Sequence, residues 1–134
     1  MRVIKVLVAL LATVVFFVLL AQSDADYMGF MKSAVASKGK VAKGIAAKDK
    51  GTVETEAKAM ESSFKEIEAY WTKKGAADAT GFAKQAVTAS ADIAKAGAAG
   101  DFDAANAAMG TLGMTCGGCH MAHRAKGDSG FQIK

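Results

Sequence analysis

Four side chains that bind metals or react through sulfur stand close together near the end of the chain. The segment TCGGCHMAHR, residues 115–124, contains both cysteines and both histidines of the 134-residue sequence, at Cys116, Cys119, His120 and His123. Two thiols three residues apart can form a disulfide, bind a metal or hold a cofactor. The secondary structure that carries these residues must therefore indicate which of the three kinds of site they form.

The order Cys-x-x-Cys-His is the attachment signature of a c-type heme. The two thiols add to the two vinyl groups of the porphyrin and become thioethers. Residues i and i+3 of a helix share a face, so Cys116 and Cys119 can straddle one porphyrin edge. His120 then reaches the iron from one side as its proximal ligand. The spacing predicts one covalently bound heme c.

Three other sites use the same residue types. A thioredoxin-like pair needs its Cys-x-x-Cys at the start of a helix that follows a strand. A zinc site would have to take Cys116, Cys119, His120 and His123 from two helical turns, whereas zinc ligands usually come from two chain segments. A plain structural disulfide is the third alternative. We expect His123 to be an edge or surface residue, because it projects from the helix that carries His120.

The N-terminal sequence is typical of a secretory signal. Arg2 and Lys5 precede an apolar run over residues 6–21, and polar and small residues follow it. We predict a signal peptide over residues 1–25, with cleavage after Ala25 or after Ser23, and a periplasmic protein. The alternative is an uncleaved anchor, the one case in which we expect membrane contact. The run is shorter than the roughly 20 apolar residues of a spanning helix.

The composition favours closely packed helices. More than half of the residues are hydrophobic, many of them alanine, and there is no proline. The net charge of +4 is mild. No concentrated basic face with stacking aromatics indicates nucleic-acid binding. Outside the cysteine-histidine segment no acid, base and nucleophile cluster, so we do not expect an enzyme.

Apolar spacing predicts four helices, over residues 26–48, 52–74, 78–96 and 101–126, and no strands. The side chains expected to face inward are Met28, Met31, Val35, Ala42 and Ile45 in the first helix, Val53, Ala57, Met60, Phe64, Ile67 and Trp71 in the second, Phe82, Ala86, Ala89 and Ile93 in the third, and Phe102, Ala105, Met109, Leu112, Cys116 and Cys119 in the fourth.

The predicted fold is all-α. Residues 26–134 are expected to form an antiparallel up-down-up-down four-helix bundle that carries a covalently bound heme and ends in a short flexible tail. Alanine buries little area, so such a bundle is short of core volume. A large apolar cofactor would fill that gap.

Bundle geometry also predicts which residue binds the iron on the side opposite His120. The start of the first helix and the end of the fourth lie at the same end of such a bundle. Met31 and His120 are both expected roughly 8 Å in from that end, at 1.5 Å per residue. Met31 is therefore the expected distal iron ligand, with Met28, one turn away, as its rival. By the same reasoning we expect Trp71 and Phe82 to line the heme pocket.

The segment GDFDAANAAMGTLGMTCGGCHMAHR resembles the last helix of class II c-type cytochromes, the cytochrome c′ and cytochrome c556 group. The resemblance extends over the mature chain, including EIEAYWTKKG, and is strongest in this last helix. In the family an Arg follows the heme-binding His by four residues, where Arg124 stands. YMGFMKS resembles the segment that supplies the distal residue, and Met31 falls on that position. The chain departs from the family at Tyr27, where an Arg often lies near a heme propionate, and at His123, where Phe or Tyr is more frequent.

The resemblance implies a monoheme c-type cytochrome that carries electrons in the periplasm between redox partner proteins, and it also allows a homodimer. The alternative is a five-coordinate cytochrome c′ that binds or scavenges nitric oxide or carbon monoxide. Lysines crowd the first helix and glutamates the second. They form either solvated faces with pairing between helices or a basic docking face for an acidic redox partner.

Overall fold

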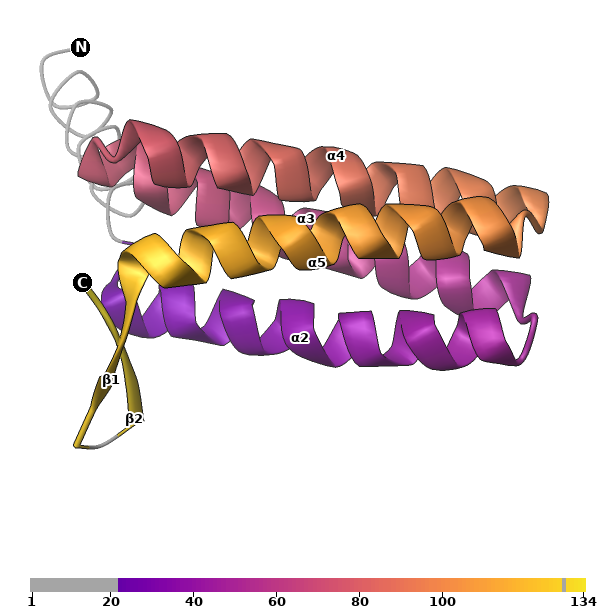
Figure 1. Cartoon of the computed structure of the whole chain (residues 1–134), viewed down its shortest axis with the longest axis horizontal. Coiled ribbons are helices and arrows are strands. Elements are labelled where there is room, and N and C mark those ends of the chain that lie inside the picture. The colour runs from indigo at the N-terminus through magenta and orange to yellow at the C-terminus, as the bar shows by residue number, and fades with distance from the viewer. Residues whose placement is uncertain (1–21, 129) are drawn as a thin grey trace, which may run out of the picture.

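Four long helices follow one another in the computed structural model, which describes residues 22–128 and 130–134 (Figure 1). They are α2 (Asp24–Ala46), α3 (Lys50–Lys74), α4 (Ala77–Ala99) and α5 (Phe102–His123). Successive helices run antiparallel and pack against each other. The predicted four-helix bundle is confirmed.

The helices begin and end at residues suited to those places. The N-terminal backbone N–H groups of three helices are bonded by Ser23, Asp49 and Asp101. Two helices end at glycines with positive φ, Gly75 and Gly100. Each helix starts within two residues of its predicted start, and α2, which begins at Asp24, starts ahead of the predicted cleavage after Ala25.

Most of the predicted signal peptide, residues 1–21, lies outside the described residues, and the signal therefore stays a prediction. Ser23 forms a reciprocal capping box with Asp26, so the predicted cleavage after Ala25 falls inside the first turn of α2. In the part of the chain that the structure describes, no helix is both long and apolar enough to span a membrane.

The core confirms the predicted inward face of α3 and corrects that of α2. All six predicted residues of α3 are buried. In α2, however, Ala42 is exposed and Val35 is 62% exposed, so these two predictions were wrong. The residues that α2 buries are Tyr27, Ala34, Ser37, Val41 and Gly44.

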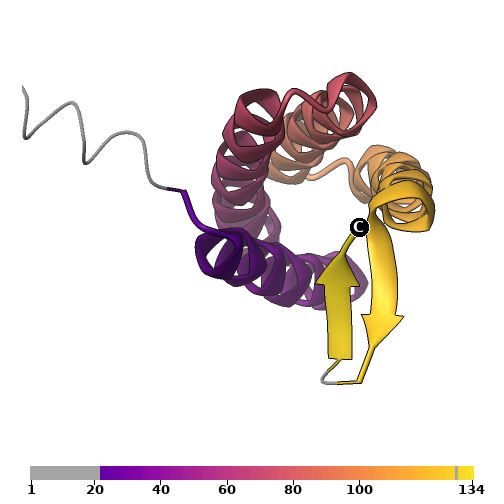
Figure 2. The same ribbon diagram turned by 90° about the vertical axis from the view of Figure 1, so that its left-hand side faces the viewer.

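The reason is that the bundle is open on one side. Helix α2 packs along α3, and α5 packs along α4, but α2 and α5 barely touch (Figure 2). The apolar stripe of α2 that includes Met28, Met31 and Val35 faces a pocket near this opening rather than α3. Apolar spacing identified the stripe but not the element it faces.

A β-hairpin follows the last helix, so the prediction that the chain has no strands was wrong. Strands β1 (Arg124–Gly127) and β2 (Gly130–Ile133) pair antiparallel, with Arg124 opposite Ile133. Helix α5 ends at His123 rather than near residue 126. The guanidinium of Arg124 lies over the ring of Phe131, 3.3 Å from its centroid, and Ile133 packs against the core. The hairpin therefore depends on contacts that its short sequence does not reveal.

Gly97 lies where α4 approaches α3 closely. A Cβ at this position would collide with the side chain of Val53. We expect Gly97→Ala to lower the free energy of unfolding by about 1–3 kcal/mol, measured by urea denaturation. The matched control is Gly110→Ala, on an exposed helical surface with no atom near the added Cβ, which should gain up to ~1 kcal/mol. Equal effects of the two substitutions would contradict this account.

Candidate functional site

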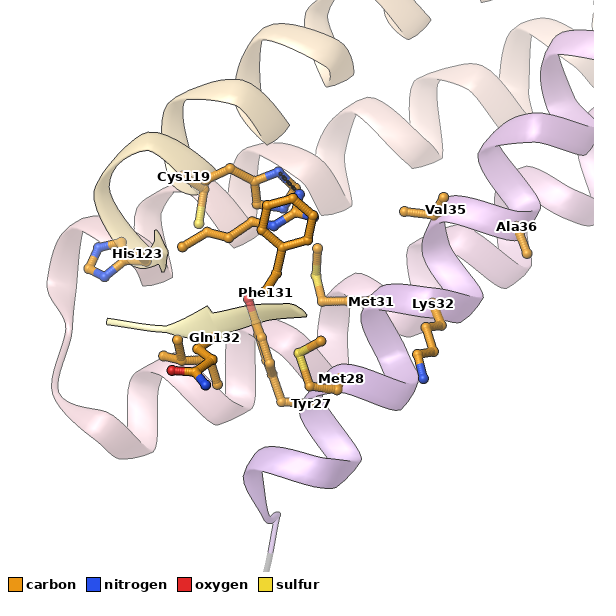
Figure 3. Close-up of a pocket in the computed structure, with 13 residues that line it drawn as sticks. Tyr27, Met28, Met31, Lys32, Val35, Ala36, Cys119, His123, Phe131 and Gln132 are labelled. Carbon is orange, nitrogen blue, oxygen red and sulfur yellow. Dashed lines mark hydrogen bonds between the residues drawn. The ribbon is translucent and has the colours of Figure 1, made fainter. Parts of the chain in front are cut away.

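A pocket of about 580 Å³ lies between the start of α2, the end of α5 and the hairpin (Figure 3). This volume is within the usual range of roughly 300–1,000 Å³ for small-molecule and cofactor sites. Its lining includes the predicted site residues Met28, Met31, Cys119, His120 and Arg124. A smaller adjoining cavity is lined by residues that include Phe82, Cys116, Cys119, His120 and Met31.

The structure brings the predicted ligands of the iron to one end of the bundle. Met31 and His120 line both cavities, Met31 from α2 and His120 from α5. Cys119 also lines both cavities, and Cys116 lines the smaller one. In Figure 3 the side chains of Met31 and Cys119 extend into the same space from their two helices. A group held by the cysteines would therefore lie within reach of α2.

Trp71 lies behind the larger pocket and does not line either cavity. It is 3% exposed, and its ring contacts those of Tyr27 and His123, with centroids 5.5 Å and 4.8 Å away. Within the described residues its buried Nε1–H has no hydrogen-bond acceptor. A buried donor without an acceptor is costly to the fold.

Tyr27, which the resemblance placed near a heme propionate, lines the pocket, and the hairpin adds pocket residues that the sequence did not indicate. Tyr27 lines both cavities and is 6% exposed, and burial raises the pKa of its phenol to about 12. Phe131 and Ile133 close the pocket from β2. Tyr27 could have been found from its place one helical turn before Met31. The hairpin residues carried no usable signal, because their role depends on the fold of a segment predicted as a tail.

The two thiols have the properties of protonated cysteines. Burial raises the pKa of Cys116, and burial together with the neighbouring Cys116 thiol and Asp78 raises that of Cys119 to about 11. Both are free and lie near the C-terminal end of α5. A thioredoxin-like pair instead needs a lowered thiol pKa at a helix N-terminus. The site therefore lacks the features of a dithiol redox centre.

His120 is held in the neutral form that a metal ligand requires. Burial, followed by the positive charges of Arg124 and Lys38, lowers the pKa of its imidazole. Arg124 Nη1 donates to His120 Nδ1 over 3.4 Å, which puts the ring proton on Nε2. Iron ligation through Nε2 requires that proton on Nδ1, so Arg124 must give up this contact when a metal binds.

His123 is engaged outside the candidate ligand set. Its Nε2 and the Oδ2 atom of Asp78 are 2.8 Å apart, and its ring lies against Trp71. Among residues 22–128 and 130–134, no group of three or more His, Cys, Asp or Glu side chains is placed to hold a metal ion. The four residues of the zinc alternative thus do not form a ready-made metal site.

The Asp78 contact predicts a dependence of stability on pH. The hydrogen bond from His123 is the main cause that lowers the pKa of Asp78. A lowered carboxyl pKa stabilises the fold above the unfolded value, about pH 4, and this stabilisation is lost as the pH falls through the folded value. We expect Asp78→Asn to lose less stability than the parent between about pH 5 and pH 2, measured by denaturant unfolding at each pH. Parallel curves would contradict the assignment.

The described residues fit a covalently bound heme. The open side of an alanine-rich bundle leaves an apolar pocket with a smaller cavity beside it, two thiols one helical turn apart line this pair of cavities, and a neutral imidazole stands beside them. Comparison of the chain with protein-family models, with curated proteins and with solved structures gave no match.

Proposed function

We propose that the protein is a monoheme c-type cytochrome that carries electrons in the periplasm. In this proposal Cys116 and Cys119 hold the heme through thioethers, His120 is the proximal iron ligand and Met31 the distal one. The observation that carries the proposal is that Met31 and His120, from helices at opposite ends of the sequence, line the same two cavities. The covalent signature and the cavity support each other.

The chain's own residues would bind and shield the group. A heme supplies reversible one-electron chemistry at its iron. His120 and Met31 would ligate the iron, and an iron that has no open site for a substrate would favour electron transfer over catalysis. Tyr27, Phe131 and Ile133 limit the access of water to the pocket. Arg124, freed from His120 Nδ1, keeps its stacking contact with Phe131 at the pocket mouth.

The test is direct. The protein, expressed with its N-terminal segment in a host that attaches c-type hemes, should give a coloured product whose mass exceeds that of the polypeptide by one heme. Its heme should survive denaturing electrophoresis, because only thioether-bound heme does. A colourless product with the mass of the polypeptide alone contradicts the proposal.

A five-coordinate cytochrome c′ that binds nitric oxide or carbon monoxide is the second candidate. The apolar lining that α2 gives the pocket, by Met28, Met31, Val35 and Ala36, favours it, because an uncharged diatomic ligand needs an apolar distal site. Rapid binding of carbon monoxide to the reduced protein would select this function. Slow or absent binding would select the electron carrier with Met31 on the iron.

A further inference from the structure

The positive side chains around the pocket have no carboxylate partner, whereas four other lysines of the described bundle do. Ion pairs join Lys40 to Glu56, Lys58 to Glu54, Lys65 to Glu61 and Lys74 to Asp24. In the described part of the chain Lys32, Lys38 and Arg124 form no such pair. Their positive charge is therefore not neutralised within the protein.

Among the described residues, no acidic side chain lines the pocket. Its lining includes Lys32 and Arg124 but neither Asp nor Glu, and the lining of the smaller cavity contains no charged Asp, Glu, Lys or Arg side chain. Lys32 lines the pocket from α2 and Arg124 lines it from the hairpin that follows α5. The positive charges thus lie on both sides of the opening between the two helices.

An exposed apolar surface lies between these charges. Val35 is 62% exposed and Phe131 55%, and both line the pocket. Lys32 and Lys38 stand three residues before and three after Val35, on neighbouring turns of α2. Arg124 stacks on Phe131 from the hairpin. The mouth of the pocket thus presents apolar side chains flanked by cations.

We propose that this surface, formed by Lys32, Val35, Lys38, Arg124 and Phe131 and called here the pocket rim, docks an acidic protein. That this partner exchanges electrons through the pocket rests on the proposed function. Transient redox interfaces are small, and complementary charge mainly accelerates the encounter. Apolar contact at the centre then brings the partner against the edge of the pocket. An acidic face suits this surface because the rim offers it only cations and apolar groups.

The binding test does not depend on the redox state of the protein. The full chain, labelled with ¹⁵N, is titrated with poly-L-glutamate as an acidic probe and with poly-L-lysine as its opposite. Poly-L-glutamate should shift the amide signals of the pocket rim, and added salt should reverse the shifts. The double variant Lys32→Glu with Lys38→Glu should weaken binding about tenfold or more.

The matched control is Lys58→Glu with Lys65→Glu. It makes the same change in net charge on α3, where both lysines pair with neighbouring glutamates. This variant should bind poly-L-glutamate nearly as well as the parent. Equal weakening in both double variants would mean that only net charge matters, and the proposal would be wrong. Stronger binding to anionic phosphatidylglycerol vesicles than to poly-L-glutamate would overturn it in favour of a membrane surface.

A kinetic test shows whether the pocket rim takes part in electron transfer. The reduced heme protein is mixed with ferricyanide, an anionic oxidant, and separately with the cationic tris(phenanthroline)cobalt(III). Reversing the charges of Lys32 and Lys38 should lower the rate of oxidation by ferricyanide about tenfold at low salt. It should raise the rate of oxidation by the cobalt complex. If the reversal instead removes the heme or changes its spectrum, these lysines neutralise the cofactor and the docking proposal fails. A chain without heme would contradict the proposed function but leave the poly-L-glutamate result to stand by itself.

Discussion

Replacing Cys116 and Cys119 together by alanine is expected to abolish covalent heme attachment. The purified double variant should have the mass of the polypeptide alone and give no heme-stained band after denaturing electrophoresis. Each single variant should keep one thioether, attach less heme and show a shifted optical spectrum. The physical reason is that the two sulfur atoms are the only described thiols in the chain, and both lie at the wall of the cavity system.

Loss of the cofactor should also destabilise the fold. In the proposed function, a bound heme would fill the opening between α2 and α5 and so stabilise the parent, whereas the double variant would leave this apolar space to water. The control is Met114→Ala, on the same helix two residues before Cys116 and 74% exposed. It should keep full heme content and a thermal midpoint close to that of the parent. Equal heme content in the double variant and the control would refute thioether attachment at these residues.

Met31→Ala is expected to convert a low-spin, six-coordinate iron into a high-spin, five-coordinate one. If Met31 ligates the iron as proposed, removing its thioether would leave the iron without this strong ligand, and the reduced variant should then bind carbon monoxide rapidly. The reduction potential should fall, because a Met ligand raises it. Optical and electron paramagnetic resonance spectra of the two oxidation states measure the change.

The matched control is Met28→Ala, which changes the same residue type in the same pocket one turn away. It should keep the low-spin spectrum. If Met28→Ala gives the high-spin spectrum and Met31→Ala does not, Met28 is the ligand. If the parent is already high-spin and binds carbon monoxide rapidly, neither methionine ligates the iron and the cytochrome c′ function is favoured.

The success of the sequence-based fold prediction has a simple cause. In α3, positions such as Val53, Met60 and Ile67 bury the same face because a helix repeats every 3.6 residues, so spacing alone identifies that face. The same argument placed Met31 and His120 at one end of an antiparallel bundle. It failed at Val35 and Ala42, because periodicity shows that a face is apolar but not whether another helix covers it.

Local sequence could not predict the hairpin either. Arg124 continues a helical pattern, yet its backbone is extended, with φ −124° and ψ 129°. The extended conformation is favoured by the contact of Arg124 with Phe131 across the turn of the hairpin. The packing of Ile133 on the core favours it as well. The same cause explains why Phe131 and Ile133 were missed as pocket residues.

The sequence by itself determined the four helices, their antiparallel order and the placing of Cys116, Cys119 and His120 on the last of them, because these follow from periodicity and residue chemistry. Only the tertiary structure decided that α2 and α5 stay apart, that a hairpin closes the mouth of the pocket and that Arg124 contacts His120. Those features arise from packing between segments distant in the chain, and no local pattern encodes which apolar faces a fold leaves uncovered.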